Sequence, residues 1–275
     1  MIKDALSRIE QKENIERVAL KYHNPSDGVY VIVDENFDYK VISKDRFAFN
    51  SKYCCWDFYS QLVNTNKAVD RKKQILSNNY LSFFCKNIDK LIDDPKIIEE
   101  YYSDMDEDVK SEKYRDWIQQ TLPTLKQYAD KKIQLKIFFL TDVEEYISQC
   151  EKYLNKKLLS NIVNDGIGVS VFLNTNPKKT YMRNKTRKNE IPYFVDIKEA
   201  KEHYYLMRLL SSLAKNGNDL LYILEDRTLV PISAKKGEML KFDFINGLIL
   251  AYKFDTRGAL IITDMDIIPS YSSNL

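Results

Sequence analysis

Histidine and cysteine are scarce in this 275-residue sequence, which contains two histidines and four cysteines. Neither His23 nor His203 belongs to a recognisable metal or nucleophile motif. Cys54 and Cys55 are adjacent, whereas the thiols of zinc sites are separated by about two to four residues. We therefore predict no metal site, no cofactor and no catalytic residue. Four thiols in a chain of this size indicate reduced side chains in a cytosolic protein.

Other features are also missing. Glycine and proline number seven each, so long flexible linkers are not expected. The first residues lack the apolar run of a signal peptide, and no uninterrupted apolar stretch approaches the length that spans a membrane. No Walker loop, helicase motif or histidine–aspartate nuclease motif is present. These absences favour a cytoplasmic binding protein over an enzyme, with a small metal-dependent nuclease as the least favoured alternative.

Net charge is nearly absent as well. Lysine and arginine total 42 against 40 acidic residues, a formal charge of +2. A dedicated nucleic-acid binder is usually more basic, so any nucleic-acid surface must be local. Hydrophobic residues at 44% and charged residues at 30% are typical of a globular protein, and 19 tyrosines and 13 phenylalanines supply core and interface material.

Periodicity predicts an α+β fold of helices and antiparallel sheet that ends in a meander of strands. The expected helices cover residues 2–22, 54–66, 75–92 and 112–120, and the segments that follow Thr141 and Asp196. The expected strands cover residues 29–33, 39–42, 134–140, 169–173 and 192–195, and the meander covers 220–224, 229–232, 239–244, 248–254 and 260–263. We treat residues 1–275 as a single module in which the acidic segment 88–113 is inserted or mobile.

Several local signals accompany this prediction. Thr141 with Glu144 has the spacing of a capping box, and Asp196 with Glu199 caps the later helix, which ends at Asn216-Gly217. The glycines at 166 and 168 indicate a turn, with close approach to a DNA groove as the alternative. Two acidic pairs resemble divalent-ion ligands, but an acidic loop and a turn are the favoured readings; the pairs are Asp104 with Asp106 and Asp264 with Asp266.

Residues 57–86 combine cations and side-chain amides beside an aromatic anchor, Phe83-Phe84. Such a combination suits phosphate and base contacts. The candidate nucleic-acid-binding residues in it are Lys67, Arg71, Lys72, Lys73, Asn78 and Asn79. Two alternatives remain open. The cations could lie in a solvated loop, and Asn78-Asn79 could be a structural cap that holds the aromatic anchor.

Residues 178–188 form the most basic window, with no acidic residue and with Tyr181 inside it. This pattern suits phosphate binding beside a stacking aromatic. Its candidate residues are Arg183, Lys185, Arg187 and Lys188. A solvated hairpin tip is an equally good interpretation.

Residues 58–84 resemble a signature in the N-terminal half of the large subunit of type I-B CRISPR Cascade, an RNA-guided DNA surveillance complex. The resemblance rests on Phe58-Tyr59-Ser60, Leu62, Asn66-Lys67, Asp70, Lys72-Lys73 and the run from Ser77 to Phe84. Three further stretches fit in order: Asp27 to Tyr30 with Val31 and Val33, Thr186 to Asn189 leading into Pro192-Tyr193, and Glu199-Ala200.

The resemblance implies a protein without a catalytic site. In that family the large subunit lies beside the 5′ handle of the guide RNA, senses the motif that flanks the target (the PAM) and helps to recruit the helicase-nuclease. The candidate cations would then contact a DNA or RNA backbone, and Asn78-Asn79 would lie at or support that surface.

The family is far longer and ends in a helical bundle for which this sequence has no counterpart. We therefore expect a truncated homologue that binds Cascade components or the helicase-nuclease as a decoy, an anti-CRISPR inhibitor encoded by a virus or a plasmid. The alternative is the N-terminal half of a working subunit that recognises the PAM and binds crRNA and target DNA.

Overall fold

The computed structural model describes residues 2–63, 68–105, 109–129, 133–158, 196–238, 244–256 and 258–272. Over these residues the chain forms helices, one mixed sheet and one antiparallel sheet, which confirms the predicted α+β class. The single module expected over residues 1–275 is instead two compact units. Residues 24–158 form the inserted unit, and residues 1–23 with 159–275 form the outer unit. The reason is that helix α2 (Ile15–Lys21) packs on helix α9 (Ile197–Lys215), far along the chain.

The inserted unit is built on a four-stranded sheet with the order β2-β1-β4-β3. Its strands are β1 (Val29–Val33), β2 (Tyr39–Ile42), β3 (Ser82–Cys85) and β4 (Leu135–Phe139). β1 and β2 form the predicted antiparallel hairpin, β4 runs parallel to β1, and β3 pairs antiparallel with β4. Every residue of β3 and β4 is buried, as expected for strands covered on both faces.

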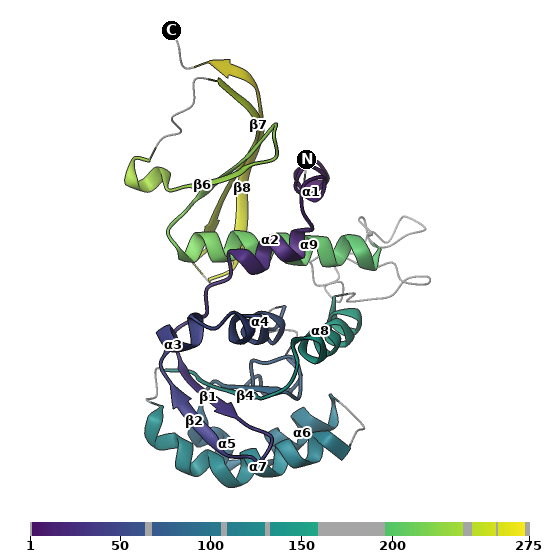
Figure 1. Cartoon of the computed structure of the whole chain (residues 1–275), viewed down its shortest axis with the longest axis vertical. Coiled ribbons are helices and arrows are strands. Elements are labelled where there is room, and N and C mark those ends of the chain that lie inside the picture. Colours follow the sequence, from purple (N-terminus) through teal and green to yellow (C-terminus); the bar gives the residue numbers. More distant parts are fainter. Residues whose placement is uncertain are drawn as a thin grey trace. The chain divides into compact units, whose positions relative to one another are not determined.

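Helices cover both faces of this sheet (Figure 1). They are α3 (Lys44–Ala48), α4 (Ser51–Tyr59), α5 (Ile88–Asp93), α6 (Lys96–Ser103), α7 (Val109–Leu125) and α8 (Val143–Lys157). Two neighbouring phenylalanines of β4 contact the helices on opposite faces of the sheet, because successive side chains of a strand point to opposite faces. Phe138 lies against Trp56 of α4, whereas Phe139 lies against Tyr114 and Trp117 of α7.

The helix predicted over residues 75–92 is wrong, because its centre is strand β3 and only its end is helical, as α5. A short apolar run such as residues 80–85 fits a buried strand or a buried helix equally well, and pairing with β4 decides between them. The helix predicted over 54–66 corresponds to α4, which starts earlier because Asn50 caps its first turn, and which ends at Tyr59.

The described residues of the acidic segment 88–113 are part of the core of the inserted unit, in contrast to the inserted or mobile segment that we predicted. Helices α5 and α6 bury five large side chains in the core: Leu91, Ile97, Ile98, Tyr101 and Tyr102. The acidic residues lie between these apolar positions, so the composition of the segment hid its amphipathic pattern. Asp106 lies outside the described residues.

Two predicted helix ends are corrected. The capping box at Thr141 does not form: Asp142 is the N-cap of α8, and the Thr141 hydroxyl donates to Glu145 Oε2 at 2.8 Å. The helix predicted over 112–120, which we expect to stop before Pro123, is α7, and it continues past this proline to Leu125. Leu122 and Leu125 are fully buried, and their burial holds the last turn in place beyond the proline.

A buried ion pair crosses the interior of the inserted unit between α4 and β4. Lys136 Nζ lies 2.6 Å from Asp57 Oδ1, and their side chains are 2% and 0% exposed. The ammonium group also lies over the rings of Tyr30 and Phe84. Burial and the nearby Asp57 carboxylate raise the pKa of the Tyr30 hydroxyl, which therefore stays protonated beside the pair.

The outer unit combines α1 (Ile2–Glu10), α2 and α9 with a second sheet. The single helix predicted over residues 2–22 is divided, since Asn14 caps α2 through a bond to the Glu16 amide. The caps predicted for α9 are confirmed: Asp196 accepts from the Glu199 amide at 2.7 Å, and the helix ends at Asn216 and Gly217, whose φ is +90°. A positive φ at this position favours glycine.

The second sheet has the strand order β6-β5-β7-β8 and is antiparallel throughout. Its strands are β5 (Leu220–Leu224), β6 (Leu229–Ile232), β7 (Phe244–Phe254) and β8 (Leu260–Ser272). β5 and β6 match the predicted strands. In a simple meander β7 would pair with β6, but here it pairs with β5. Asp264 and Asp266 lie within β8 instead of in a turn, because β8 continues well past the predicted end at residue 263.

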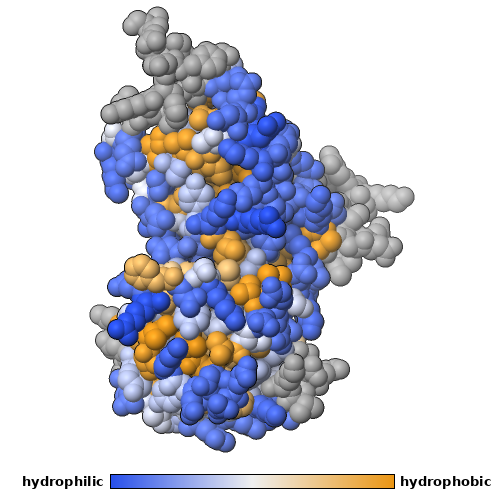
Figure 2. Space-filling view, viewed as in Figure 1, coloured by the Kyte–Doolittle hydropathy of each residue, from blue (hydrophilic) through white to orange (hydrophobic). Residues whose placement is uncertain are grey.

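Alternation along β5 and β7 places Leu221, Ile223, Leu248 and Leu250 on one buried face. Helix α9 contacts β7 and β8, and α1 contacts β5. In Figure 2, hydrophobic residues are visible where these strands lie. Among the residues described, no helix has both the length and the apolar character needed to cross a membrane. Some predicted features lie outside the described residues. They are the strands over 169–173 and 192–195, the glycines at 166 and 168, and most of the strand over 239–244.

Replacing Lys136 with methionine should destabilise the inserted unit by about 3–5 kcal/mol, because the buried Asp57 carboxylate would lose its counter-charge. Urea unfolding followed by tryptophan fluorescence measures this loss, since Trp56 and Trp117 both lie in the inserted unit. The Lys136→Met/Asp57→Leu double variant should be more stable than the Lys136→Met single variant.

The matched control is Lys44→Met, which breaks an ion pair at a similar distance, 2.7 Å to Asp27, whose side chain is 93% exposed. An exposed pair contributes about 1 kcal/mol or less. Equal losses for Lys136→Met and Lys44→Met would contradict the role given to the buried pair.

The stability of the outer unit should fall as the pH falls through about 6.5. Burial lowers the pKa of His203 from its usual 6.5, and the nearby Glu199 opposes this shift while Lys3 adds to it. The unfolded chain therefore binds the proton first, so the stabilisation is complete above pH 6.5 and is lost as acid is added. Urea unfolding followed by far-UV circular dichroism should show a shallower pH dependence for His203→Gln than for wild type. The tryptophan signal of the inserted unit serves as the internal control and should not respond to this substitution.

Candidate nucleic-acid interface

The residues that carry the resemblance lie mainly in the connection between α4 and β3, residues 60–81. One isolated bridge joins the two ends of this connection, Gln61 with Ser77, and a second joins Ile75 to Cys85 of β3. Its middle is fixed by Asp70, which is 1% exposed and accepts from the backbone amides of Gln74 and Ile75 at 2.8 and 3.1 Å. The connection is therefore an ordered part of the inserted unit over its described residues.

Asn79 is the centre of a buried polar network. Its Nδ2 donates to Ser60 Oγ at 3.2 Å and to Asn78 Oδ1 at 2.7 Å. Its Oδ1 accepts from the Leu81 amide at 3.0 Å and from Ser82 Oγ at 3.1 Å. A side-chain amide has two donors and two acceptor positions, so all four are used inside the protein.

Asn78 belongs to the same network. It is 3% exposed, and its Nδ2 donates to the Gln61 carbonyl at 2.9 Å and contacts Cys150 Sγ of α8 at 3.6 Å. Neither amide has a donor left for a base edge, which corrects the prediction that Asn78 and Asn79 bind nucleic acid directly. Of the two readings left open by the sequence, the structural cap is the one that these bonds support.

Two tyrosine hydroxyls hold the same turn from other elements, and a third holds the start of the connection at Val63. Tyr101 of α6 donates to the Asn79 carbonyl at 2.7 Å, and Tyr146 of α8 donates to the Leu81 carbonyl at 2.7 Å. The Tyr153 hydroxyl accepts from the Val63 amide at 3.2 Å. Burial raises the pKa of Tyr101 and of Tyr146 well above the usual value, so both hydroxyls remain donors at neutral pH.

The predicted cations of this connection that the structure describes, Arg71, Lys72 and Lys73, lie on its surface, and Arg71 and Lys72 each face an acidic side chain. Arg71 Nε lies 3.0 Å from Glu100 Oε1, and Lys72 pairs with Asp94. The Lys72 ammonium group lowers the pKa of the Asp94 carboxyl, and Asp94 raises the pKa of Lys72. Lys73 has a positive φ of 54°, in a turn where its amide donates to the Asp70 carbonyl at 3.1 Å. The remaining predicted cations, Lys67, Arg183, Lys185, Arg187 and Lys188, lie outside the described residues.

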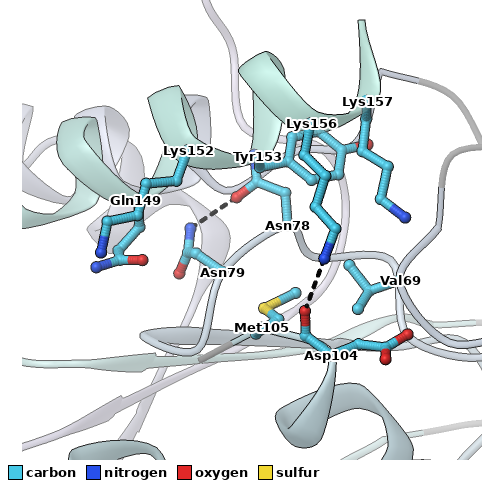
Figure 3. Close-up of a pocket in the computed structure, with 10 residues that line it drawn as sticks. All are labelled: Val69, Asn78, Asn79, Asp104, Met105, Gln149, Lys152, Tyr153, Lys156 and Lys157. Atoms are coloured by element: carbon cyan, nitrogen blue, oxygen red, sulfur yellow. Dashed lines mark hydrogen bonds between the residues drawn. The ribbon is translucent and has the colours of Figure 1, made fainter. Parts of the chain in front are cut away.

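A pocket of about 70 Å³ lies beside the Asn78-Asn79 turn. Figure 3 shows α8 on one side of it and Val69, Asp104 and Met105 on the other. Helix α8 contributes Gln149, Lys152, Tyr153, Lys156 and Lys157. Lys156 extends across the pocket and donates to the Asp104 carbonyl at 3.3 Å.

Asn78, Asn79 and Asp104, which we named from the sequence, also line this pocket. Sequence reasoning missed the polar residues that α8 contributes, although they repeat at helical spacing. Gln149, Lys152 and Lys156 follow each other at intervals of three and four residues, so they share one side of α8. The apolar spacing of this helix, at Val143, Tyr146, Ile147, Cys150, Tyr153 and Leu154, predicts a core-facing side. Tyr146, Cys150, Tyr153 and Leu154 are buried, whereas Val143 and Ile147 are half-buried. Within the described part of the chain, no three histidine, cysteine or acidic side chains lie together as a metal site would require.

No protein-family model, curated protein or solved structure matches this chain.

Asn79→Ala should destabilise the inserted unit by about 3 kcal/mol or more, because it leaves buried donors and acceptors without partners. Tryptophan-monitored urea unfolding measures the loss. Asn155→Ala is the matched control, since Asn155 is an exposed residue of α8. If the two variants unfold at the same urea concentration, the Asn79 network does not hold the turn.

Proposed function

We propose that this protein binds the type I-B CRISPR interference machinery in the cytoplasm of a prokaryotic cell and inhibits it as a decoy of the Cascade large subunit. Its targets are Cascade subunits or the helicase-nuclease that Cascade recruits. The proposal begins from the resemblance of residues 58–84 to the large-subunit signature and assigns the protein no catalytic step.

The observation that carries the proposal is the convergence of the signature residues in space. The polar members of the signature that the structure describes as buried are Ser60, Asp70, Ser77, Asn78, Asn79 and Ser82. Most of them bond to one another or to the same turn. A chance match in sequence carries no expectation that the matched polar residues share one buried network. A signature that encodes one folded turn does carry that expectation.

Surface charge favours a protein partner over a polyanion at this turn. Arg71 and Lys72 face Glu100 and Asp94, so their charges are locally balanced. Phosphate contacts would have to displace these carboxylates, whereas a protein surface can pair with both signs of charge. A decoy needs only one interface of standard size, on the order of 1,600 Å².

The second candidate is a working large-subunit module that recognises the PAM and binds crRNA and target DNA. The basic window over residues 178–188 favours it, because six cations without an acidic residue suit a nucleic-acid backbone. The two candidates make opposite predictions in cells that carry type I-B Cascade.

Expression of the protein in cells with an intact type I-B system should reduce interference against a targeted plasmid, and the transformation efficiency of that plasmid measures the effect. Affinity-purified protein should retain a Cascade subunit or the helicase-nuclease from a mixture of the purified components. Restored interference in a strain that lacks the large subunit would establish the working module and reject the decoy. Failure to bind any component would reject both.

Charge reversal maps the surface that binds. Arg71→Glu/Lys72→Glu should weaken capture of the partner, because both side chains are exposed beside the signature turn. Lys235→Glu/Lys236→Glu makes the same change in net charge at exposed positions of the outer unit and should leave capture unchanged. Equal capture by both double variants would place the interface elsewhere.

A further inference from the structure

The pocket beside α8 has an excess of positive charge. Its lining carries three ammonium groups, on Lys152, Lys156 and Lys157, and one carboxylate, on Asp104. Lys156 is engaged through its bond to the Asp104 carbonyl. Lys152 and Lys157 have no ion-pair partner among the described residues. Three cations against one carboxylate at one small cavity favour a negatively charged ligand.

Gln149 supplies a hydrogen-bond donor at the cavity. Its side chain is 9% exposed and lines the cavity, and its amide makes no hydrogen bond within the described part of the chain. The amide is not among the buried polar atoms that lack a partner, so it is free to exchange a solvent contact for a ligand. The amide nitrogen is a donor of the kind that binds phosphate oxygens in nucleic-acid complexes.

The electrostatics of Lys157 agree with this view. Burial, and then the charge of neighbouring Lys156, lower the pKa of Lys157, while Asp104 acts in the opposite direction. Keeping Lys157 in its charged form therefore costs free energy in the protein without a ligand. An anion in the pocket would reduce this cost, because an opposite charge favours the ammonium form.

Size restricts the ligand to a single group. Pockets that enclose whole small molecules have volumes of about 300–1,000 Å³, whereas this cavity has about 70 Å³. The cavity suits one tetrahedral anionic group whose remaining substituents extend into solvent. A nucleobase with its sugar would not be enclosed.

We propose that this pocket binds a phosphate group through the Gln149 amide and the Lys152 and Lys157 ammonium groups. The phosphate comes from a nucleic-acid backbone or from a smaller phosphate compound, and the two sources share this chemistry. The inference is independent of the proposed Cascade partnership, because every residue in it belongs to α8 and the surfaces that α8 faces. The isolated chain is therefore sufficient for its test.

Two probes test the site on the purified full chain. Pyrophosphate binding is measured by isothermal titration calorimetry, and binding of a labelled single-stranded thymidine oligonucleotide is measured by fluorescence anisotropy. An oligonucleotide of the same sequence with an uncharged methylphosphonate backbone separates phosphate contacts from base contacts. Saturable pyrophosphate binding alone identifies a small phosphate compound as the source. Competition between pyrophosphate and the charged oligonucleotide identifies a nucleic-acid backbone.

Three variants locate the ligand. Lys152→Gln and Lys157→Gln should each weaken pyrophosphate binding roughly tenfold, the effect of one charge-assisted hydrogen bond. Gln149→Met preserves the size of the side chain and removes its amide, so binding should weaken while thermal stability stays the same or rises. For the oligonucleotide, the Lys152→Gln/Lys157→Gln variant should reduce the slope of log K against log salt by about 1.4, the value for two single-strand phosphate contacts.

Lys235→Gln/Lys236→Gln in the outer unit is the matched control and should bind both probes as wild type does. The proposal is overturned if folded wild-type protein binds neither probe at concentrations of about 1 mM. It is equally overturned if the α8 variants and the control variant bind pyrophosphate with the same affinity.

Discussion

The side-chain amide of Asn79 is the constraint on which the inserted unit depends. Its four hydrogen bonds connect the end of α4, through Ser60, to the start of β3, through Leu81 and Ser82. Tyr101 and Tyr146 then attach α6 and α8 to the same turn through its carbonyl oxygens. A turn held from four elements has one geometry, because each donor and acceptor is buried and would be costly to leave unpaired.

The core around this turn is aromatic and contains one charged pair. Phe138, Trp56 and Tyr146 pack on one face of β4, and the Lys136–Asp57 pair lies on that same face. Hydrophobic packing supplies most of the stabilisation. The ion pair contributes little net free energy, but any arrangement that separates its two charges is strongly destabilised. Together the pair and the Asn79 network restrict how α4 can lie on the sheet.

Function is assigned to the surface around this rigid turn. The buried amides of Asn78 and Asn79 shape the turn, and both proposals assign the contacts to exposed side chains around it. Arg71 and Lys72 are balanced by acidic residues, as suits a protein partner. The pocket beside α8 has three cations against one carboxylate, as suits a phosphate. One scaffold therefore presents two surfaces of different chemistry.

The sequence by itself determined the α+β class, the β1–β2 hairpin, strand β4, the caps of α9 and the strands β5 and β6, because periodicity and capping are properties of neighbouring residues. Tertiary structure alone decided that residues 82–85 are a strand, since only pairing with β4 separates a buried strand from a buried helix. It also decided that Asn78 and Asn79 point inward and that Gln149 meets Lys157 at a pocket. Both outcomes depend on contacts between residues distant in sequence, and local patterns carry no information about which distant groups satisfy a buried amide.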